Sequence, residues 1–303
     1  MSNTLERNSE ILFLYDAMLT NPNGDPDDEN KPRYDYDTQR NLVSDVRLKR
    51  YIRDYWINKG EGVYVSKEEG KAVTSTKKVE DLLKDLQTKE ECVRKVTDTF
   101  KDIKYFGATI PLKTKIANLD SITLTGPVQF TWGYSLHPTE ILHSSTITSQ
   151  LAGRESDHGT MGKDWRIKYS LIGFYGIVSA WRAKETGLTD EDVKNFDKEI
   201  IKALKLQATT RSKIGQTPRL YVRIEWNDDE TFFGDLRNLV KVQPKTSYAP
   251  ASLEDIDIDF SGLSELLKNE KISMVYVWIE EEFAKKVKGL EMPQGGKVEF
   301  IAI

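Results

Sequence analysis

An apolar segment followed by a run of turn-forming residues constrains the fold more than any other feature of this sequence. Residues 10–20 read EILFLYDAMLT, and the next ten residues, NPNGDPDDEN, are rich in Asn, Asp, Pro and Gly. A continuous apolar run bounded by turn signals is typical of a strand buried in a sheet. The sequence therefore predicts a buried strand that leads into a long loop near residue 21.

A segment of alternating apolar and basic residues follows this loop. It predicts a helix over residues 38–58, which ends before Gly60. With about 100° between successive residues, one helix face carries Leu48, Tyr51, Ile52 and Tyr55. Four of the seven residues from 47 to 53 are basic and occupy most of the opposite face: Arg47, Lys49, Arg50 and Arg53. We expect this helix to pack on one side and to offer cations on the other.

The rest of the chain alternates between predicted helices and strands. Helices are predicted over residues 76–87 and 89–104 and from Thr189 onward, where Thr88 with Glu91 and Thr189 with Asp192 have the spacing of N-terminal caps. Strands are predicted near residues 106–110, 121–136, 165–179, 219–226, 272–281 and 297–303, and a long polar loop over residues 137–164. Without the insertions, the order is strand, helix, strand, strand, helix, strand. This is the ferredoxin-like order of RNA-recognition domains, so the predicted fold class is α+β.

Charge and composition narrow the possible functions. The net charge of −4 argues against indiscriminate nucleic-acid binding, but five basic residues and no acid lie between residues 205 and 223, which favours a local basic groove. A single cysteine, Cys92, excludes an internal disulfide and fits a reducing compartment. No apolar run reaches the roughly 18 residues of a membrane span, and the first residues lack the apolar core of a secretory signal. We expect a cytoplasmic protein without membrane contact.

Seven motifs occur in a characteristic order along the chain. They are NPNGDPD (21–27), KPRYD (31–35), SDVRLKRYIRDYW (44–56), TGPVQFTWGYSLHP (125–138), TIT (146–148), MGKD (161–164) and TTRSKIGQTPRLYVRIEW (209–226). In this order and at these spacings, the chain closely resembles the guide-RNA backbone subunit of type I CRISPR Cascade complexes, a branch of the RAMP superfamily. The nearest group is subtype I-B, the Hmari/Tneap branch, and the subtype I-C backbone subunit is a close relative.

This resemblance implies a single hand-shaped domain over residues 8–303. It has an RNA-recognition-like palm at about residues 8–60, 105–137, 165–245 and 270–303. A helical fingers insertion covers about residues 62–104, and a thumb loop or hairpin covers about residues 138–164. It also implies a non-catalytic subunit without cofactor or metal, which polymerises along CRISPR guide RNA and presents its bases to target DNA.

The resemblance also implies a set of protein partners. Further copies of the chain would form a helical filament along the guide RNA. The other partners would be the large subunit, the small subunit, the subunit that caps the 5′ end of the guide, and the repeat-processing endoribonuclease.

Four groups of residues are candidates for RNA contact. The helix cations Arg47, Lys49, Arg50 and Arg53 suit a phosphate backbone, since guanidinium groups bind phosphates without reading sequence, although a solvated face is the alternative. The turn with Asn21, Asn23 and Gly24 either holds a phosphate on backbone N–H groups or is only a turn. Arg211, Ser212, Lys213 and Gln216 form a run of donors without acids, which is either a clamp or a solvated loop. Met161, between Gly159 and Gly162, either wedges between bases or covers a small local core.

The alternative function is an RNA endonuclease of the same superfamily. His137, His143 and His158 flank the predicted thumb, and related subunits of type III complexes cut RNA with a loop aspartate, which makes Asp35 or Asp37 a remote candidate. The acidic run Asp25 to Glu29 departs from the spacing of a calcium-binding loop. The stretch GFYGIV (173–178) partly matches a base-stacking strand, but core packing is the favoured interpretation.

Overall fold

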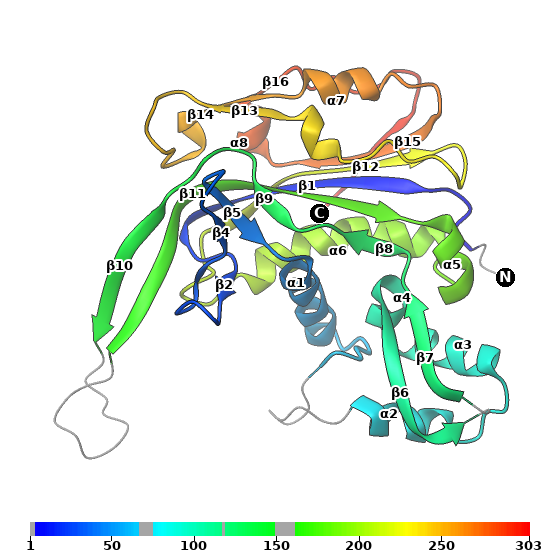
Figure 1. The fold of residues 1–303 in the computed structure, drawn as a ribbon. Helices are drawn as coiled ribbons and strands as arrows, with labels where there is room; N and C mark the ends of the chain where they lie inside the picture. The colour runs from blue at the N-terminus through cyan, green and yellow to red at the C-terminus, as the bar shows by residue number, and fades with distance from the viewer. Residues whose placement is uncertain (1–3, 67–74, 117–118, 149–160) are drawn as a thin grey trace, which may run out of the picture.

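The computed structural model describes residues 4–66, 75–116, 119–148 and 161–303 (Figure 1). The chain has a mixed α+β fold built on a large central sheet. Strand β1 (Ser9–Thr20) lies in the middle of this sheet, antiparallel to β11 (Met161–Val178) on one side and to β12 (Gln216–Trp226) on the other. The buried strand predicted over residues 10–20 is confirmed.

Further strands extend the sheet on both sides of these three. Its order is β17-β15-β12-β1-β11-β9-β5-β4, and β8 and β10 also pair with β11. The additional strands are β4 (Tyr34–Asp35), β5 (Arg40–Val43), β8 (Val128–Phe130), β9 (Gly133–Ser135), β10 (Ile141–Thr148), β15 (Ile272–Ile279) and β17 (Val298–Phe300). The strands predicted near residues 219–226, 272–281 and 297–303 therefore exist as β12, β15 and β17.

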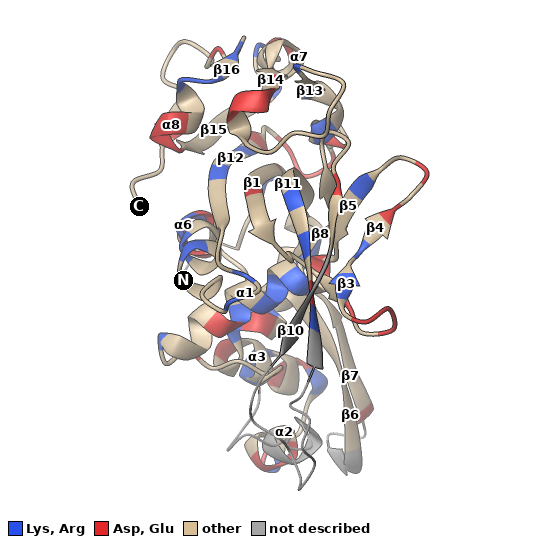
Figure 2. Ribbon diagram, turned by 90° about the vertical axis from the view of Figure 1, so that its left-hand side faces the viewer, with Lys and Arg blue, Asp and Glu red and all other residues tan. Residues whose placement is uncertain are grey.

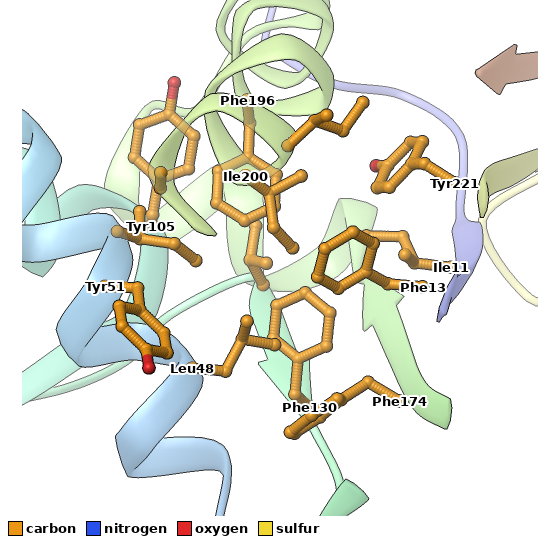
Figure 3. Close-up of a cluster of buried hydrophobic side chains, with 14 of the residues drawn as sticks. Ile11, Phe13, Leu48, Tyr51, Tyr105, Phe130, Phe174, Phe196, Ile200 and Tyr221 are labelled. Atoms are coloured by element: carbon orange, nitrogen blue, oxygen red, sulfur yellow. The ribbon is translucent and has the colours of Figure 1, made fainter. Parts of the chain in front are cut away.

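Two helices cover one face of this sheet. They are α1 (Asp45–Asn58) and α6 (Asp190–Gln207), and α6 begins with the capping box predicted at Thr189 and Asp192. Between the helices and the sheet lies a core that includes Phe13, Phe174 and Phe196 (Figure 3). Phe174 is completely buried there, which confirms core packing for the stretch over residues 173–178.

The opposite face of the sheet is covered by the C-terminal part of the chain. Three short strands, β13 (Lys241–Pro244), β14 (Ile256–Asp259) and β16 (Val287–Lys288), form a small sheet beside α7 (Ser261–Leu266) and α8 (Glu281–Ala284). The core on this side includes Leu12, Leu14, Phe260 and Leu263. Because successive side chains of β1 point to opposite faces and both faces are buried, the strand is apolar almost throughout.

A separate unit lies between α1 and the strands β8 and β9 along the chain. It contains α2 (Ser75–Leu83), α3 (Lys89–Thr99), α4 (Lys101–Phe106) and the hairpin of β6 (Gly107–Ile116) and β7 (Leu119–Thr125), around a core of its own. The capping box of Thr88 and Glu91 is present, and Cys92 is buried as expected. The single helix predicted over residues 89–104 is wrong, because Phe100 has extended backbone angles and separates α3 from α4.

Two other predicted boundaries are corrected. The helix predicted from residue 38 begins only at Asp45, because Arg40–Val43 pairs as β5 and Ser44 caps the helix. The long loop predicted over residues 137–164 contains β10, which pairs with the first part of β11 in a hairpin that projects from the sheet (Figure 1). The remaining elements are β2 (Gly24–Asp25), β3 (Lys31–Pro32), α5 (Ala180–Thr186) and the 3₁₀ turns Leu236–Leu239 and Leu253–Asp255. Among the helices in the described ranges, none combines the length and apolar character that a bilayer crossing requires.

Candidate nucleic-acid interface

The predicted RNA-binding residues come from three segments that meet at the C-terminal end of β1. These segments are the turn after β1, the first turns of α1, and the loop between α6 and β12. The turn is held by its own side chains, because Asn23 Oδ1 accepts hydrogen bonds from the backbone N–H and the hydroxyl of Ser44 at 2.8 and 2.9 Å. The N-cap of α1 is thus attached directly to the turn.

Asn21 and Gly24 have structural contacts in this turn. The backbone N–H of Asn21 donates to the Ser212 carbonyl at 2.9 Å, and its side-chain amide donates to the Asn30 carbonyl at 2.7 Å. A Cβ added at Gly24 would lie 2.0 Å from Asn30 Oδ1, so the close approach requires glycine. Asn21 is only 2% exposed, so the expectation that its amide N–H is free to hold a phosphate is wrong.

The four predicted cations of α1 divide into two pairs. Lys49 is buried, pairs with Asp45 at 3.1 Å and donates to Gln129 Oε1 at 2.9 Å. Arg53 pairs at 2.9 Å with Asp102, which is buried and also accepts the backbone N–H of Tyr64. The expectation that Lys49 and Arg53 present their charges to solvent is therefore wrong. Both side chains instead bind polar groups on other elements, Gln129 for Lys49 and Asp102 for Arg53.

Arg47 and Arg50 remain on the accessible side of α1. The guanidinium of Arg47 lies 4.0 Å from the centroid of the Tyr51 ring, and its buried Nε has no hydrogen-bond partner. Arg50 pairs with Asp54 one turn later at 2.6 Å, a half-exposed contact of the kind that contributes only about 0.3–0.5 kcal/mol. Figure 2 shows basic residues on α1 and along β11, on the side that faces the viewer.

The loop before β12 contributes one exposed cation and one whose ammonium is bound by the protein backbone. Arg211, whose side chain is 64% exposed, pairs with Asp164 at 3.2 Å. The ammonium of Lys213 donates to the backbone carbonyls of Asn21 and Pro22, and burial, together with the charge of Arg47, lowers the pKa of Lys213 to about 7. Lys213 therefore connects the loop to the turn after β1 through hydrogen bonds.

Ser212 and Gln216 also hold the loop in place. The carbonyl of Ser212 accepts hydrogen bonds from the Thr20 hydroxyl and the Asn21 N–H. Gln216 is buried, and its amide donates to the Tyr51 hydroxyl and to the Lys213 carbonyl, both at 3.0 Å. The expectation that Gln216 offers a free donor is wrong, since its N–H groups bind other parts of the protein.

One basic residue of this region was missed in the sequence. Arg166, near the start of β11, donates to the Leu19 carbonyl at 2.6 Å and makes two hydrogen bonds to Asp164. Because Asp164 also pairs with Arg211, this carboxylate joins the base of the hairpin to the loop before β12. In the sequence, Arg166 lies within a predicted strand, and the pairing of β11 with β1 brings it here.

The predicted wedge lies at the end of the hairpin. Met161 is the first residue of β11, and its backbone pairs with Thr148 of β10. The Met161 side chain and residues 149–160, which include His158, lie outside the described residues. Two residues further along β11, Lys163 pairs with Glu29 of the turn between β2 and β3 at 2.6 Å.

The candidate catalytic residues in the described ranges do not converge. His137 is fully buried, its Nδ1 contacts the Pro138 carbonyl at 2.8 Å, and its Nε2 accepts the Leu171 N–H at 3.1 Å. Burial lowers the pKa of His137 to about 4, so the ring is neutral and structural. His143 is exposed, and Asp35 accepts a hydrogen bond from Thr38 in the hairpin of β4 and β5. Within the residues that the structure describes, no three His, Cys, Asp or Glu side chains gather as a metal site.

Comparison with solved structures identifies the class of fold. A chain of the structure described as "CRISPR RNA-guided surveillance complex, pre-nicking" matches with a TM-score of 0.53 at 13% identity, covering 90% of this chain and 93% of that one. At this identity the match shows a shared fold.

The sequence comparisons identify the family. The model of the family "CRISPR-associated protein Cas7" matches residues 7–261. The chain is also 36% identical over 296 residues to the CRISPR-associated protein Cas7 of Haloferax volcanii, which covers 90% of this chain and 87% of the relative. The chain belongs to the Cas7 family.

Proposed function

We propose that this Cas7-family chain is a non-catalytic, RNA-binding subunit of a CRISPR RNA-guided surveillance complex. The observation that carries the proposal is that Arg47, Arg50 and Arg211 stand on segments that meet at the end of β1. Arg47 has no carboxylate partner among the described residues, and the other two have only partly exposed ion pairs. Guanidinium groups of this kind can exchange a weak surface contact for a phosphate.

The other cations of this region have a supporting role in this proposal. Lys49 and Arg53 hold α1 against neighbouring elements, and Lys213 and Arg166 hold the loop and the hairpin base around the end of β1. We assign phosphate contact to Arg47, Arg50 and Arg211, and we assign positioning to the other four. Contacts to phosphates carry no base information, so the chain would grip guides of any sequence.

The hand-shaped organisation is part of the same proposal. The order β1, α1, β8 and β9, β11, α6, β12 is strand, helix, strand, strand, helix, strand once insertions are removed, which supports a ferredoxin-like palm. The unit of α2 to β7 would be the fingers, and the hairpin of β10 and β11 would be the thumb with Met161 at its described end. Assembly of copies along guide RNA, pairing of the guide with target DNA, the other complex subunits and the subtype I-B assignment remain predictions from the resemblance.

The test is a triple variant with Arg47→Gln, Arg50→Gln and Arg211→Gln. If each arginine neutralises one phosphate, the slope of log affinity against log salt should become shallower by about two units, at about 0.7 per contact for a single strand. The measurement is a salt series of binding titrations with two unrelated single-stranded RNAs, which should respond alike. RNA recovered from the same reactions, with and without magnesium, should be intact.

The matched control removes three cations elsewhere. Lys268, Lys285 and Lys288 are exposed and pair with acids of the C-terminal part, so their triple replacement by Gln changes the net charge equally. The control should keep the original slope. An arginine variant with an unchanged slope would contradict the proposed site, and magnesium-dependent cleavage would support the nuclease alternative.

A further inference from the structure

From Lys194 to Lys205, one face of α6 carries only lysines among its charged residues. The helix sequence DEDVKNFDKEIIKALKLQ contains five acids and four lysines, so the helix as a whole is slightly acidic. At about 100° per residue, the lysines lie within an arc of about 80°. Lys198 and Lys205 are exposed, and Lys194 and Lys202 are partly exposed. Exposed Glu191 lies on the same face N-terminal to Lys194, so the acid-free part of this face runs from Lys194 to Lys205.

The acids of α6 beyond its first two residues are engaged elsewhere. Asp192 closes the N-terminal capping box and pairs with Lys104. Asp197 pairs with buried Arg223, and Glu199 accepts hydrogen bonds from the Trp56 indole and the Lys101 ammonium. On the lysine face, Lys194 pairs with Glu299 at 3.4 Å. In the parts of the chain that the structure describes, Lys198, Lys202 and Lys205 form no ion pair.

The lysine face points away from α1 and from the arginine site. The α1 side of α6 is marked by Glu199, which binds Trp56, and by Gln207, which accepts a hydrogen bond from Asn58. Around the helix axis, these two residues lie about 105° and 185° from the centre of the lysine arc. Lys194 instead lies 5.4 Å from the ring centroid of Tyr276 on β15. A nucleic-acid strand bound to Arg47 and Arg50 would therefore lie on a different side of the helical layer from the lysine face.

We propose that the lysine face of α6 binds the sugar–phosphate backbone of a second nucleic-acid strand, separate from the strand at the arginine site. Lys198 to Lys205 spans about 10 Å along the helix axis, over which one DNA strand presents about three phosphates. Lysine is depleted in protein–protein interfaces, so the three lysines without an ion pair favour a polyanion over a protein partner. This proposal depends on the proposed function in one respect: the RNA strand from which the second strand is separate is the one assigned to the arginine site.

The test is a triple variant with Lys198→Gln, Lys202→Gln and Lys205→Gln. Its affinity for a fluorescent, non-complementary single-stranded DNA is measured across a salt series, with the protein first free and then saturated with single-stranded RNA. Loss of three phosphate contacts should make the salt slope for DNA shallower by about two units in both conditions. RNA affinity should stay unchanged, and the triple variant at Lys268, Lys285 and Lys288 should keep the original DNA slope.

Three results would overturn the inference. An unchanged DNA slope would mean that the lysines are only solvated. An equal loss of RNA affinity would mean that one strand uses both surfaces. A change in sedimentation without a change in DNA affinity would place a protein on the lysine face. If the arginine variant leaves RNA binding unaltered while the lysine variant loses DNA contacts, the proposed guide site fails and the lysine surface stands.

Discussion

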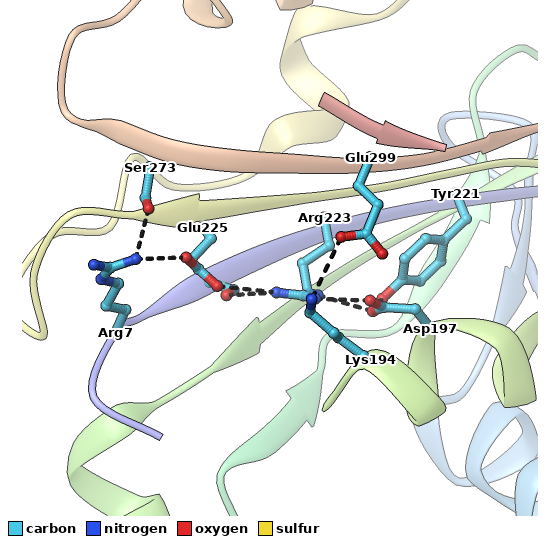
Figure 4. Close-up of polar contacts among 9 residues, drawn as sticks. Arg7, Lys194, Asp197, Tyr221, Arg223, Glu225, Ser273 and Glu299 are labelled. Carbon is cyan, nitrogen blue, oxygen red and sulfur yellow. Dashed lines mark hydrogen bonds and ion pairs between the residues drawn. The ribbon is translucent and has the colours of Figure 1, made fainter. Parts of the chain in front are cut away.

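Arg223 carries its charge in the interior, between the sheet and α6. Its guanidinium makes two hydrogen bonds to Asp197, at 2.7 and 2.8 Å, while the Tyr221 hydroxyl donates to the same carboxylate (Figure 4). Burial opposes the charge, but Asp197 outweighs it and raises the pKa of Arg223. The basic segment identified over residues 205–223 is therefore partly internal, since Arg219 also pairs with Asp16.

Removing one partner of the buried pair should be costly. In Asp197→Asn, the carboxylate that remains beside Arg223 among the described residues is that of Glu225, at the longer distance of 3.8 Å. The free energy of unfolding should fall by about 3–5 kcal/mol, as for other uncompensated buried charges. Urea denaturation measures this loss. The control Glu265→Gln, which breaks an exposed pair with Lys268, should change stability by no more than about 0.5 kcal/mol, and similar losses in both variants would contradict the argument.

His137 makes stability depend on pH. Its pKa of about 4 in the folded protein lies below the roughly 6.5 of an unfolded chain, so the unfolded state binds more protons between these values. The contribution of His137 to the free energy of unfolding should be constant above pH 6.5 and fall by about 3 kcal/mol as the pH decreases to 4. Urea denaturation at several pH values should show this decrease, and His137→Gln should lose this component. If the free energy of unfolding of the variant still depends on pH in the same way, other groups cause the dependence.

At the scale of elements, the beginning of α1 decides where the arginine site lies. Ser44 accepts the Arg47 N–H at 3.3 Å, and both its N–H and its hydroxyl donate to Asn23. The helix therefore starts in a fixed relation to the turn after β1, although helical periodicity alone extends the prediction back to residue 38. Pairing of β5 with β9 takes those earlier residues into the sheet.

Loss of this cap should destabilise the protein measurably. Ser44→Ala removes the hydrogen bond to the first turn of α1 and leaves the Asn23 side-chain oxygen with one donor fewer. The free energy of unfolding should decrease by about 1 kcal/mol, within the usual 0.5–2 kcal/mol for N-cap residues. Ser121→Ala, at an exposed position of β7, serves as the control in the same denaturation series. Equal stability of the two variants would show that the cap is dispensable.

At the scale of the whole molecule, the central sheet is enclosed on both faces. Helices α1 and α6 cover one face, and the segment after residue 240 covers the other and supplies β15 beside β12. The apolar side chains on the second face include Leu12, Leu14, Val222 and Ile224, all fully buried. The fold therefore depends on residues far apart in the chain.

A chain that ends at residue 240 should not fold cooperatively. Exposing these four side chains to water alone would remove about 1.5–3 kcal/mol of stabilising free energy for each. The sum is comparable with the free energy of unfolding of a whole domain, roughly 5–15 kcal/mol. We expect retained far-ultraviolet but lost near-ultraviolet circular dichroism, with dye binding to exposed apolar surface. A chain that ends at residue 296, which lacks Lys297, β17 and the residues after it, should unfold cooperatively at lower stability. Cooperative unfolding of the shorter chain would contradict the enclosed-sheet argument.

Local sequence signals determined the elements of this protein well. Turn residues after β1, the caps at Thr88 and Thr189, and the apolar run over residues 10–20 each act within a few positions of the chain, so their effects are visible without a fold. The motifs likewise led to the family that the comparisons show. Breaks such as Phe100, and the strands Arg40–Val43 and Ile141–Thr148, depended on pairing and packing with distant segments.

The availability of each charge was decided only by the tertiary structure. Arg50 and Arg53 are one helical turn apart with the same local surroundings, yet Arg50 meets a half-exposed Asp54 and Arg53 meets buried Asp102. Lys213 and Arg211 stand two residues apart, and the ammonium of Lys213 binds backbone carbonyls while the side chain of Arg211 is exposed. A charge is free or engaged according to the partner that the fold brings to it, and that partner lies 49 residues away for Arg53. The spacing of residues in the sequence does not indicate such a partner.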